Sequence, residues 1–160
     1  MSKITIILIK LKSFWSIIYL LKYTWYMRKE AYVEAYLEVS KISQDVVNLG
    51  LYRYRLDKAY LAFKLRNYEE SMLLFEASIT VINTAYSKNI VSSDERDYFK
   101  EYAFGYLIIL SKVYKEFIKV DFYTNELQKL NYNISKIKNT KFYACPLIIG
   151  DKWDKESERR

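Results

Sequence analysis

The sequence predicts an all-α fold, an antiparallel bundle of five to six helices followed by a short extended C-terminal tail. The 160 residues include only 3 glycines and 1 proline, and these are the residues on which hairpins, bulges and tight turns of β-folds depend. Apolar residues recur instead at alternating spacings of three and four, which is the period of an amphipathic helix. With 51% hydrophobic and 28% charged residues, the composition is that of one folded domain.

We expect three parts, an apolar basic N-terminal segment (1–26), a helical bundle domain (27–140) and an extended, charged tail (141–160). The N-terminal apolar runs are interrupted by Lys10 and Lys12, so no uncharged stretch reaches the length of a spanning helix. The apolar core is also not followed by the small residues of a signal-peptide cleavage site.

Three interpretations of residues 1–26 stay open. The first is an extra helix that packs on the bundle, and the second is peripheral membrane contact through Trp15, Tyr19, Trp25 and the lysines. The third places the biological start at Met27, where Met-Arg-Lys-Glu-Ala-Tyr has the composition of a helix start. Residues 1–28 hold five basic residues and no acidic one, which accounts for most of the net charge of +7.

The body is expected to begin with two helices, over 29–48 and 52–65. The first would end at Asn48, with Gly50 as a left-handed cap. The core faces of the two helices are, respectively, Tyr32, Tyr36, Val39, Ser43 and Val46, and Tyr52, Leu56, Ala59, Tyr60 and Phe63.

Asn67 is predicted to cap the third helix, over 68–86, with Glu70 completing a capping box. This helix has the strongest period in the chain, at Tyr68, Met72, Phe75, Ile79, Ile82 and Tyr86. A loop over 87–93 follows, and Ser92 with Glu95 predicts the start of a long fourth helix that reaches about Lys119.

The middle of that fourth helix, 102–110, is apolar on nearly every side, so we expect it to be the most buried helix, with a neighbour close to Gly105. The last helix is expected over 123–138, with its core face at Tyr123, Leu127, Leu130, Ile134 and Ile137. Residues 142–149, with Pro146, are predicted to be extended, and 151–160 to be frayed.

The composition excludes several chemistries. There is no histidine, which removes Ser/His/Asp, Cys/His and His-metal sites. Cys145 has no second cysteine to pair with, so we expect an inert thiol and a cytoplasmic protein. No Gly-rich phosphate loop occurs either.

From these absences we predict no catalytic residue, no metal, no cofactor and no small-molecule substrate. A site built from carboxylates or lysines is left open. The acidic pairs 69–70 and 94–95 fall in first helical turns, where acids interact favourably with the helix dipole.

One basic and aromatic cluster is the best candidate for binding a phosphate-bearing partner, because Lys and Arg neutralise phosphates and exposed aromatic rings stack on bases. Its members are Arg53, Tyr54, Arg55, Lys58, Lys64 and Arg66. They flank the predicted core stripe on both sides, and an ordinary solvated face is the alternative interpretation.

The hairpin over 52–83 resembles a tetratricopeptide-type helix pair. The resemblance rests on the turn Arg-Asn-Tyr-Glu-Glu (66–70) and on the packing positions Ala59, Tyr68, Ser71, Phe75 and Ser78. It departs from the family at Arg55, Lys58 and Asn83, and no second copy follows at the required period. The same short-turn hairpin also resembles HEPN-type domains, whose active members are ribonucleases with an Arg-x4-6-His motif. Without histidine, that resemblance implies a non-catalytic member.

The sequence therefore predicts a non-enzymatic α-helical interaction or scaffold protein that acts through protein–protein contacts, with a protein partner or a homo-oligomer. The alternative is a nucleic-acid-binding, catalytically silent HEPN-like bundle that uses the basic and aromatic helix face.

Overall fold

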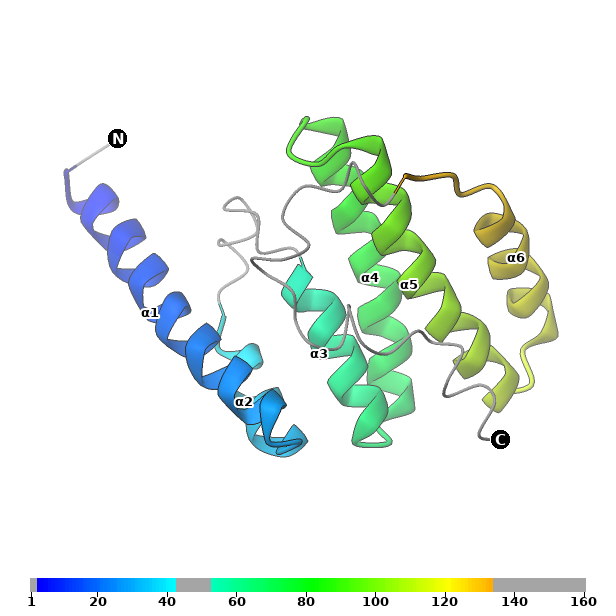
Figure 1. The fold of residues 1–160 in the computed structure, drawn as a ribbon, viewed down its shortest axis with the longest axis horizontal. Coiled ribbons are helices and arrows are strands. Elements are labelled where there is room, and N and C mark those ends of the chain that lie inside the picture. Colours follow the sequence, from blue (N-terminus) through cyan, green and yellow to red (C-terminus); the bar gives the residue numbers. More distant parts are fainter. Residues whose placement is uncertain (1–2, 43–52, 134–160) are drawn as a thin grey trace.

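A computed structural model describes residues 3–42 and 53–133, and this part of the chain is entirely helical apart from its connections (Figure 1). The side chains of 3–14, Ile17 and Arg53 lie outside the description. The helices are α1 Lys3–Arg28, α2 Tyr32–Ser40, α3 Arg53–Lys64, α4 Tyr68–Ser87, α5 Ser93–Val113 and α6 Phe117–Gln128. The predicted all-α fold is confirmed.

The helices form a row in which each packs mainly on the helices that precede and follow it in the sequence (Figure 1). Helix α1 lies at one end of the row and α6 at the other, with α3, α4 and α5 between them. Within residues 3–42 and 53–133 the row does not close on itself, so each end helix has neighbouring helices on one side only. The two ends are therefore where unburied apolar surface is expected.

Four tight turns share one backbone conformation. In each, a residue other than glycine adopts a left-handed φ of 54° to 60°, at Glu30, Arg66, Asn89 and Lys115. At Lys115 the following amide, that of Glu116, donates to the carbonyl of Ser111 at 2.8 Å, and the amide of Lys115 donates to that of Lys112 at 3.1 Å. These two bonds define a Schellman motif, and the same pair occurs at the other three turns.

In three of these turns, the residue after the left-handed one also has the same backbone conformation. Ala31, Asn67 and Glu116 have φ between −81° and −87° and ψ between 67° and 72°, and each directly precedes a helix. The pairs α1–α2, α3–α4 and α5–α6 are thus hairpins with the same three-residue connection. The connection between α4 and α5 differs from these three. It is longer, and it ends at Ser92, an N-cap with an extended backbone.

The Lys115 turn corrects the predicted boundaries of the last two helices. The fourth expected helix ends at Val113 rather than near Lys119, and α6 begins at Phe117 and ends at Gln128, rather than covering 123–138. No glycine or proline marks this break in the sequence. Apolar residues continue through the turn, so the periodic pattern alone predicts one uninterrupted helix here.

The predicted boundaries near the N-terminus also change. Met27 does not open a helix, because α1 runs through it to Arg28, and Lys29 and Glu30 belong to the turn before α2. Helix α1 packs on α2, and the choice among the three interpretations of residues 1–26 stays a prediction. The predicted cap at Gly50, the continuation of the first helix past Ile42, and every expectation for residues 134–160 lie outside the described residues.

One predicted capping box forms and the other does not. At α5, Glu95 donates its amide to Oγ of Ser92 at 3.2 Å, and the amide of Ser92 donates to Oε2 of Glu95 at 3.1 Å. At α4, Asn67 occupies the N-cap without a side-chain cap. Its Nδ2 instead donates to Oε2 of Glu70 at 2.6 Å, and the other oxygen of Glu70 accepts from Tyr36.

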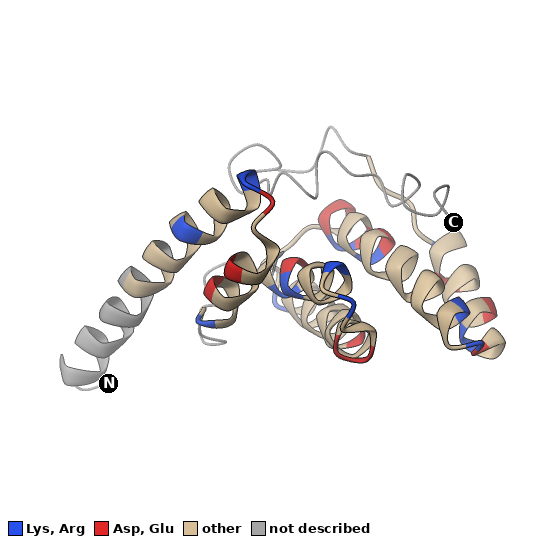
Figure 2. Cartoon of the chain, turned by 90° about the horizontal axis from the view of Figure 1, so that it is seen from below, with Lys and Arg blue, Asp and Glu red and all other residues tan. Residues whose placement is uncertain are grey.

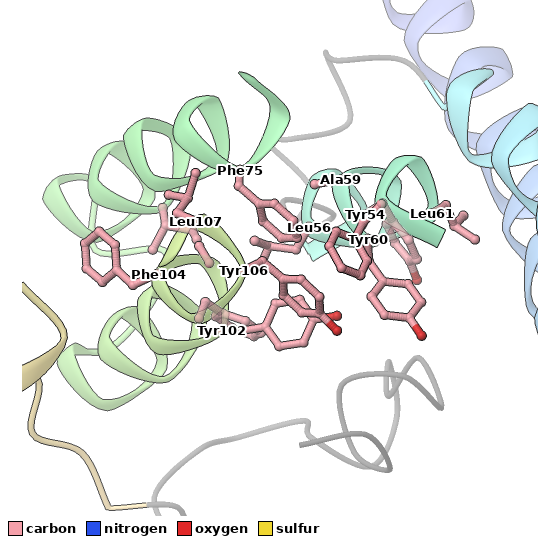
Figure 3. Close-up of a cluster of buried hydrophobic side chains, with 14 of the residues drawn as sticks. Tyr54, Leu56, Ala59, Tyr60, Leu61, Phe75, Tyr102, Phe104, Tyr106 and Leu107 are labelled. Carbon is pink, nitrogen blue, oxygen red and sulfur yellow. The ribbon is translucent and has the colours of Figure 1, made fainter. Parts of the chain in front are cut away.

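The core lies between α3, α4 and α5 (Figure 3). The expected burial of 102–110 is confirmed, with only Ile109 partly exposed, but α3 is buried as thoroughly from Leu56 to Phe63 except at Lys58. The rings of Phe75 and Tyr106 stack at 5.0 Å between centroids. Gly105 is buried within α5, as its predicted close packing requires.

Candidate interaction surfaces

The predicted basic and aromatic cluster lies on α3, between α2 and α4. Tyr54 is buried, and its ring meets that of Tyr23 on α1 edge to face at 6.0 Å between centroids. It therefore belongs to the core and does not present the exposed ring that base stacking requires. Of Arg53, nothing beyond its place at the start of α3 is described.

The two lysines of the cluster are partly buried against neighbouring helices. Lys58 Nζ lies 5.4 Å from the ring centroid of Tyr36 and 4.0 Å from Oε1 of Glu70. Lys64 Nζ lies 5.9 Å from the ring centroid of Tyr32 and 5.4 Å from that of Tyr60. Ammonium groups over tyrosine faces help to hold α2 on α3.

Arg55 is partly exposed and Arg66, in the turn, is exposed. The structure does not gather the described members of the cluster into one exposed patch, since Tyr54 is buried and the lysines face α2. Whether these residues bind nucleic acid stays a prediction.

Tyrosine hydroxyls bonded to carboxylates join helices at three places. Tyr36 on α2 donates to Glu70 on α4, Tyr123 on α6 donates to Glu76 on α4, and Tyr132 after α6 donates to Glu101 on α5. Burial, and then the bonded Glu70, raise the pKa of Tyr36 to about 12. Burial and the partner carboxylate raise the pKa of Tyr123 and of Tyr132 as well. These hydroxyls stay protonated and act as hydrogen-bond donors. The three bonds are therefore structural.

The predicted acidic pairs, 69–70 and 94–95, lie in the first turns of α4 and α5, as expected. Asp94 accepts from the amide of Asn133 at 2.7 Å, and Asp97 accepts from that of Asn131 at 3.4 Å, so the first turns of α5 hold the chain that follows α6. Sequence reasoning missed this role because it depends on contacts between residues more than thirty positions apart. The described residues contain no group of His, Cys, Asp and Glu side chains able to hold a metal ion.

The free side of α6 carries large apolar side chains. Ile118 is 87% exposed, Phe117 66% and Phe122 56%. Val120, Tyr123 and Leu127, on the other side of the same helix, pack on the core. Tyr114 in the turn before α6 and Val113 at the end of α5 extend the exposed set. We call Val113, Tyr114, Phe117, Ile118 and Phe122 the α6 face.

A second exposed set lies at the opposite end of the row. Trp15, Leu21 and Trp25 on α1 are about half exposed or more, whereas Ser16, Tyr23 and Met27 on the same helix are buried. We call Trp15, Leu21 and Trp25 the α1 face. Across the described residues, no helix has the length and apolar character needed to cross a bilayer.

The chain matches no family model, and neither the curated proteins nor the solved structures yield a match. What the protein does must therefore be argued from its own surfaces.

Proposed function

We propose that this protein is a non-enzymatic α-helical interaction or scaffold protein that acts through protein–protein contacts. The single observation that supports this most is the α6 face. Large apolar side chains gathered on one exposed helix face are typical of surfaces that another protein covers, and aromatic residues are enriched in such interfaces.

The chemistry of the α6 face fits another protein surface of the same kind. Its five members are uncharged, and Asp121 is the acidic residue on the exposed side of α6 between them. The five apolar members can pack on the same five of a second copy in a pairing that keeps the two Asp121 carboxylates apart. A twofold pairing of α6 with α6 of another copy is therefore the version we test first.

The repeated hairpin supports the tetratricopeptide-like resemblance over the HEPN-like one. Three hairpins with one turn conformation follow each other along the row, as in repeat proteins whose helix pairs stack on their neighbours. Repeat proteins of this kind present extended surfaces for binding other proteins, which agrees with the role proposed here.

The experiment is light scattering of the full chain over a range of concentrations. We expect a mass that rises with concentration for the unmodified chain, and the monomer mass throughout for Ile118→Lys. The matched control is Leu73→Lys on α4, since Leu73 is 62% exposed and lies outside the α6 face. A monomer mass at every concentration for the unmodified chain would contradict self-association and leave a different protein as the partner.

A further inference from the structure

We propose that the α1 face docks on the surface of an anionic lipid bilayer. This inference is independent of the α6 face, which lies at the other end of the row (Figure 1). It rests on the geometry of α1, on the chemistry of its exposed side chains and on its charge.

Among the described helices, none covers most of the length of α1. With 26 residues, α1 is about 39 Å long, whereas α2, its main packing partner, has 9 residues and is about 14 Å long. The residues that contact the core follow a helical spacing, Ser16, Tyr23 and Met27. Leu21, 66% exposed, and Trp25, 51% exposed, are four residues apart on a different side. Leu21 and Trp25 are therefore exposed on a side of α1 that faces away from the core.

The side chains of the α1 face suit the boundary between headgroups and acyl chains. Tryptophan combines a large apolar ring with one N–H donor and is enriched at that depth. Leu21 supplies an aliphatic side chain that would enter the acyl region.

The positive charge of α1 indicates that the bilayer surface it contacts is anionic. Residues 1–28 include Lys3, Lys10, Lys12, Lys22 and Arg28 and no acidic residue. In the described part of α1 the basic positions occur without acidic ones, and the first acid, Glu30, lies in the turn beyond it (Figure 2). Lys22 and Arg28 are exposed, and Lys29 Nζ lies 3.8 Å from the ring centroid of Trp25.

This charge argues against a second copy as the occupant. Two α1 helices from different copies would bring five basic residues against five, which is unfavourable at close range. Anionic headgroups supply the opposite charge over an extended plane, and basic side chains close to such a surface bind it. Basic residues beside an exposed aromatic and aliphatic face are the composition of helices that lie in the membrane interface.

The test is flotation of the full chain with vesicles of two compositions, phosphatidylcholine alone and phosphatidylcholine mixed with phosphatidylglycerol. We expect binding to the mixed vesicles and little to the neutral ones. Raising the salt concentration from about 0.1 M to about 1 M shortens the screening length from about 10 Å to about 3 Å and should release most of the protein.

Two matched variants locate the binding surface. Leu21→Glu should lower the partition coefficient on mixed vesicles at least about tenfold, because it removes an inserted apolar side chain and adds a negative charge. Leu73→Glu makes the same substitution at a similarly exposed position of α4 and should change it little. Circular dichroism melting of both variants checks that the fold is retained, as expected for exposed positions.

Three results would overturn the proposal. They are no flotation with mixed vesicles, equal flotation with neutral and mixed vesicles, or equal losses for Leu21→Glu and Leu73→Glu. Ile118→Lys, which should abolish self-association, is expected to leave flotation unchanged. A loss of flotation in this variant would place the lipid contact at α6 instead of α1 and would also overturn the proposal.

Discussion

The hydroxyl of Tyr123 on α6 donates a hydrogen bond to Oε1 of Glu76 on α4 at 2.7 Å. Helices α4 and α6 both pack on α5, so this bond connects the two helices on either side of it. Lys119, one turn earlier on α6, places Nζ 3.9 Å from Sδ of Met72, one turn earlier on α4. These contacts fix the rotation of α6 and thereby determine that Phe117, Ile118 and Phe122 face outward.

Replacing Tyr123 by Phe should therefore destabilise the fold. The ring stays in place, but Glu76 loses a donor at a partly buried site, and hydrogen bonds to charged groups contribute about 1.5–3 kcal/mol. We expect the free energy of unfolding in urea to fall by about 2 kcal/mol. Tyr114→Phe is the control, since Tyr114 is exposed and its variant should remain within about 0.5 kcal/mol of the parent. Equal stabilities for Tyr123→Phe and the parent would show that this hydrogen bond does not stabilise the fold.

Lys115→Gly should stabilise the protein. A left-handed conformation costs a residue with a side chain about 1–2 kcal/mol, and glycine avoids that cost while losing more backbone entropy on folding. The net gain expected is about 0.5–1 kcal/mol, seen as a higher melting temperature. The control is Lys112→Gly in the last turn of α5, which should lower the free energy of unfolding by about 1 kcal/mol. Destabilisation by Lys115→Gly comparable to that by Lys112→Gly would contradict the left-handed turn.

The Tyr36–Glu70 bond predicts a pH dependence above pH 10. The pKa of Tyr36 is raised from 10.0 to about 12 in the folded protein, so the folded state binds its proton more tightly than the unfolded chain does. The stability that this contributes is fully present below pH 10 and is lost as the pH rises through about 12. In ¹³C NMR of labelled tyrosine, the signal that disappears in Tyr36→Phe should titrate near pH 12. A midpoint near 10 would show that the hydroxyl is not held by Glu70.

Nucleic-acid binding by the cluster on α3 has its own test. If the prediction holds, affinity for single-stranded RNA should fall steeply with salt, because basic side chains displace counterions from phosphates. Arg55→Glu and Arg66→Glu together should abolish binding, while Lys88→Glu, an exposed site at the end of α4, should have a smaller effect. Absence of binding at low salt would eliminate this alternative.

How much of this could be predicted from the sequence depends on the kind of signal. The stripe from Leu56 to Phe63 and the capping box at Ser92 have local patterns, and both are confirmed. The turn at Lys115 has no such pattern, since a Schellman motif normally uses glycine and here a lysine takes that conformation. The α6 face was missed for the same reason, because the expected long helix included Phe117 and Ile118.

Other features depend on contacts between distant residues. The sequence marked Tyr54 as exposed because it lies beside basic residues, but packing of Tyr23 from α1 buries it. Asn67 does not cap α4, and Glu70, expected to complete its capping box, accepts from Tyr36 on α2. Neither neighbour can be identified from spacing along the chain, since each comes from a separate helix.

The central claim is that the α6 face contacts another protein, and the most direct measurement is a dilution series followed by methyl NMR of the full chain. If α6 pairs with α6, the methyl signals of Ile118 and Val113 should shift with concentration, whereas those of Leu73 should not. Shifts at Leu73 with none at Ile118, or concentration-independent signals throughout, would contradict self-association through this face.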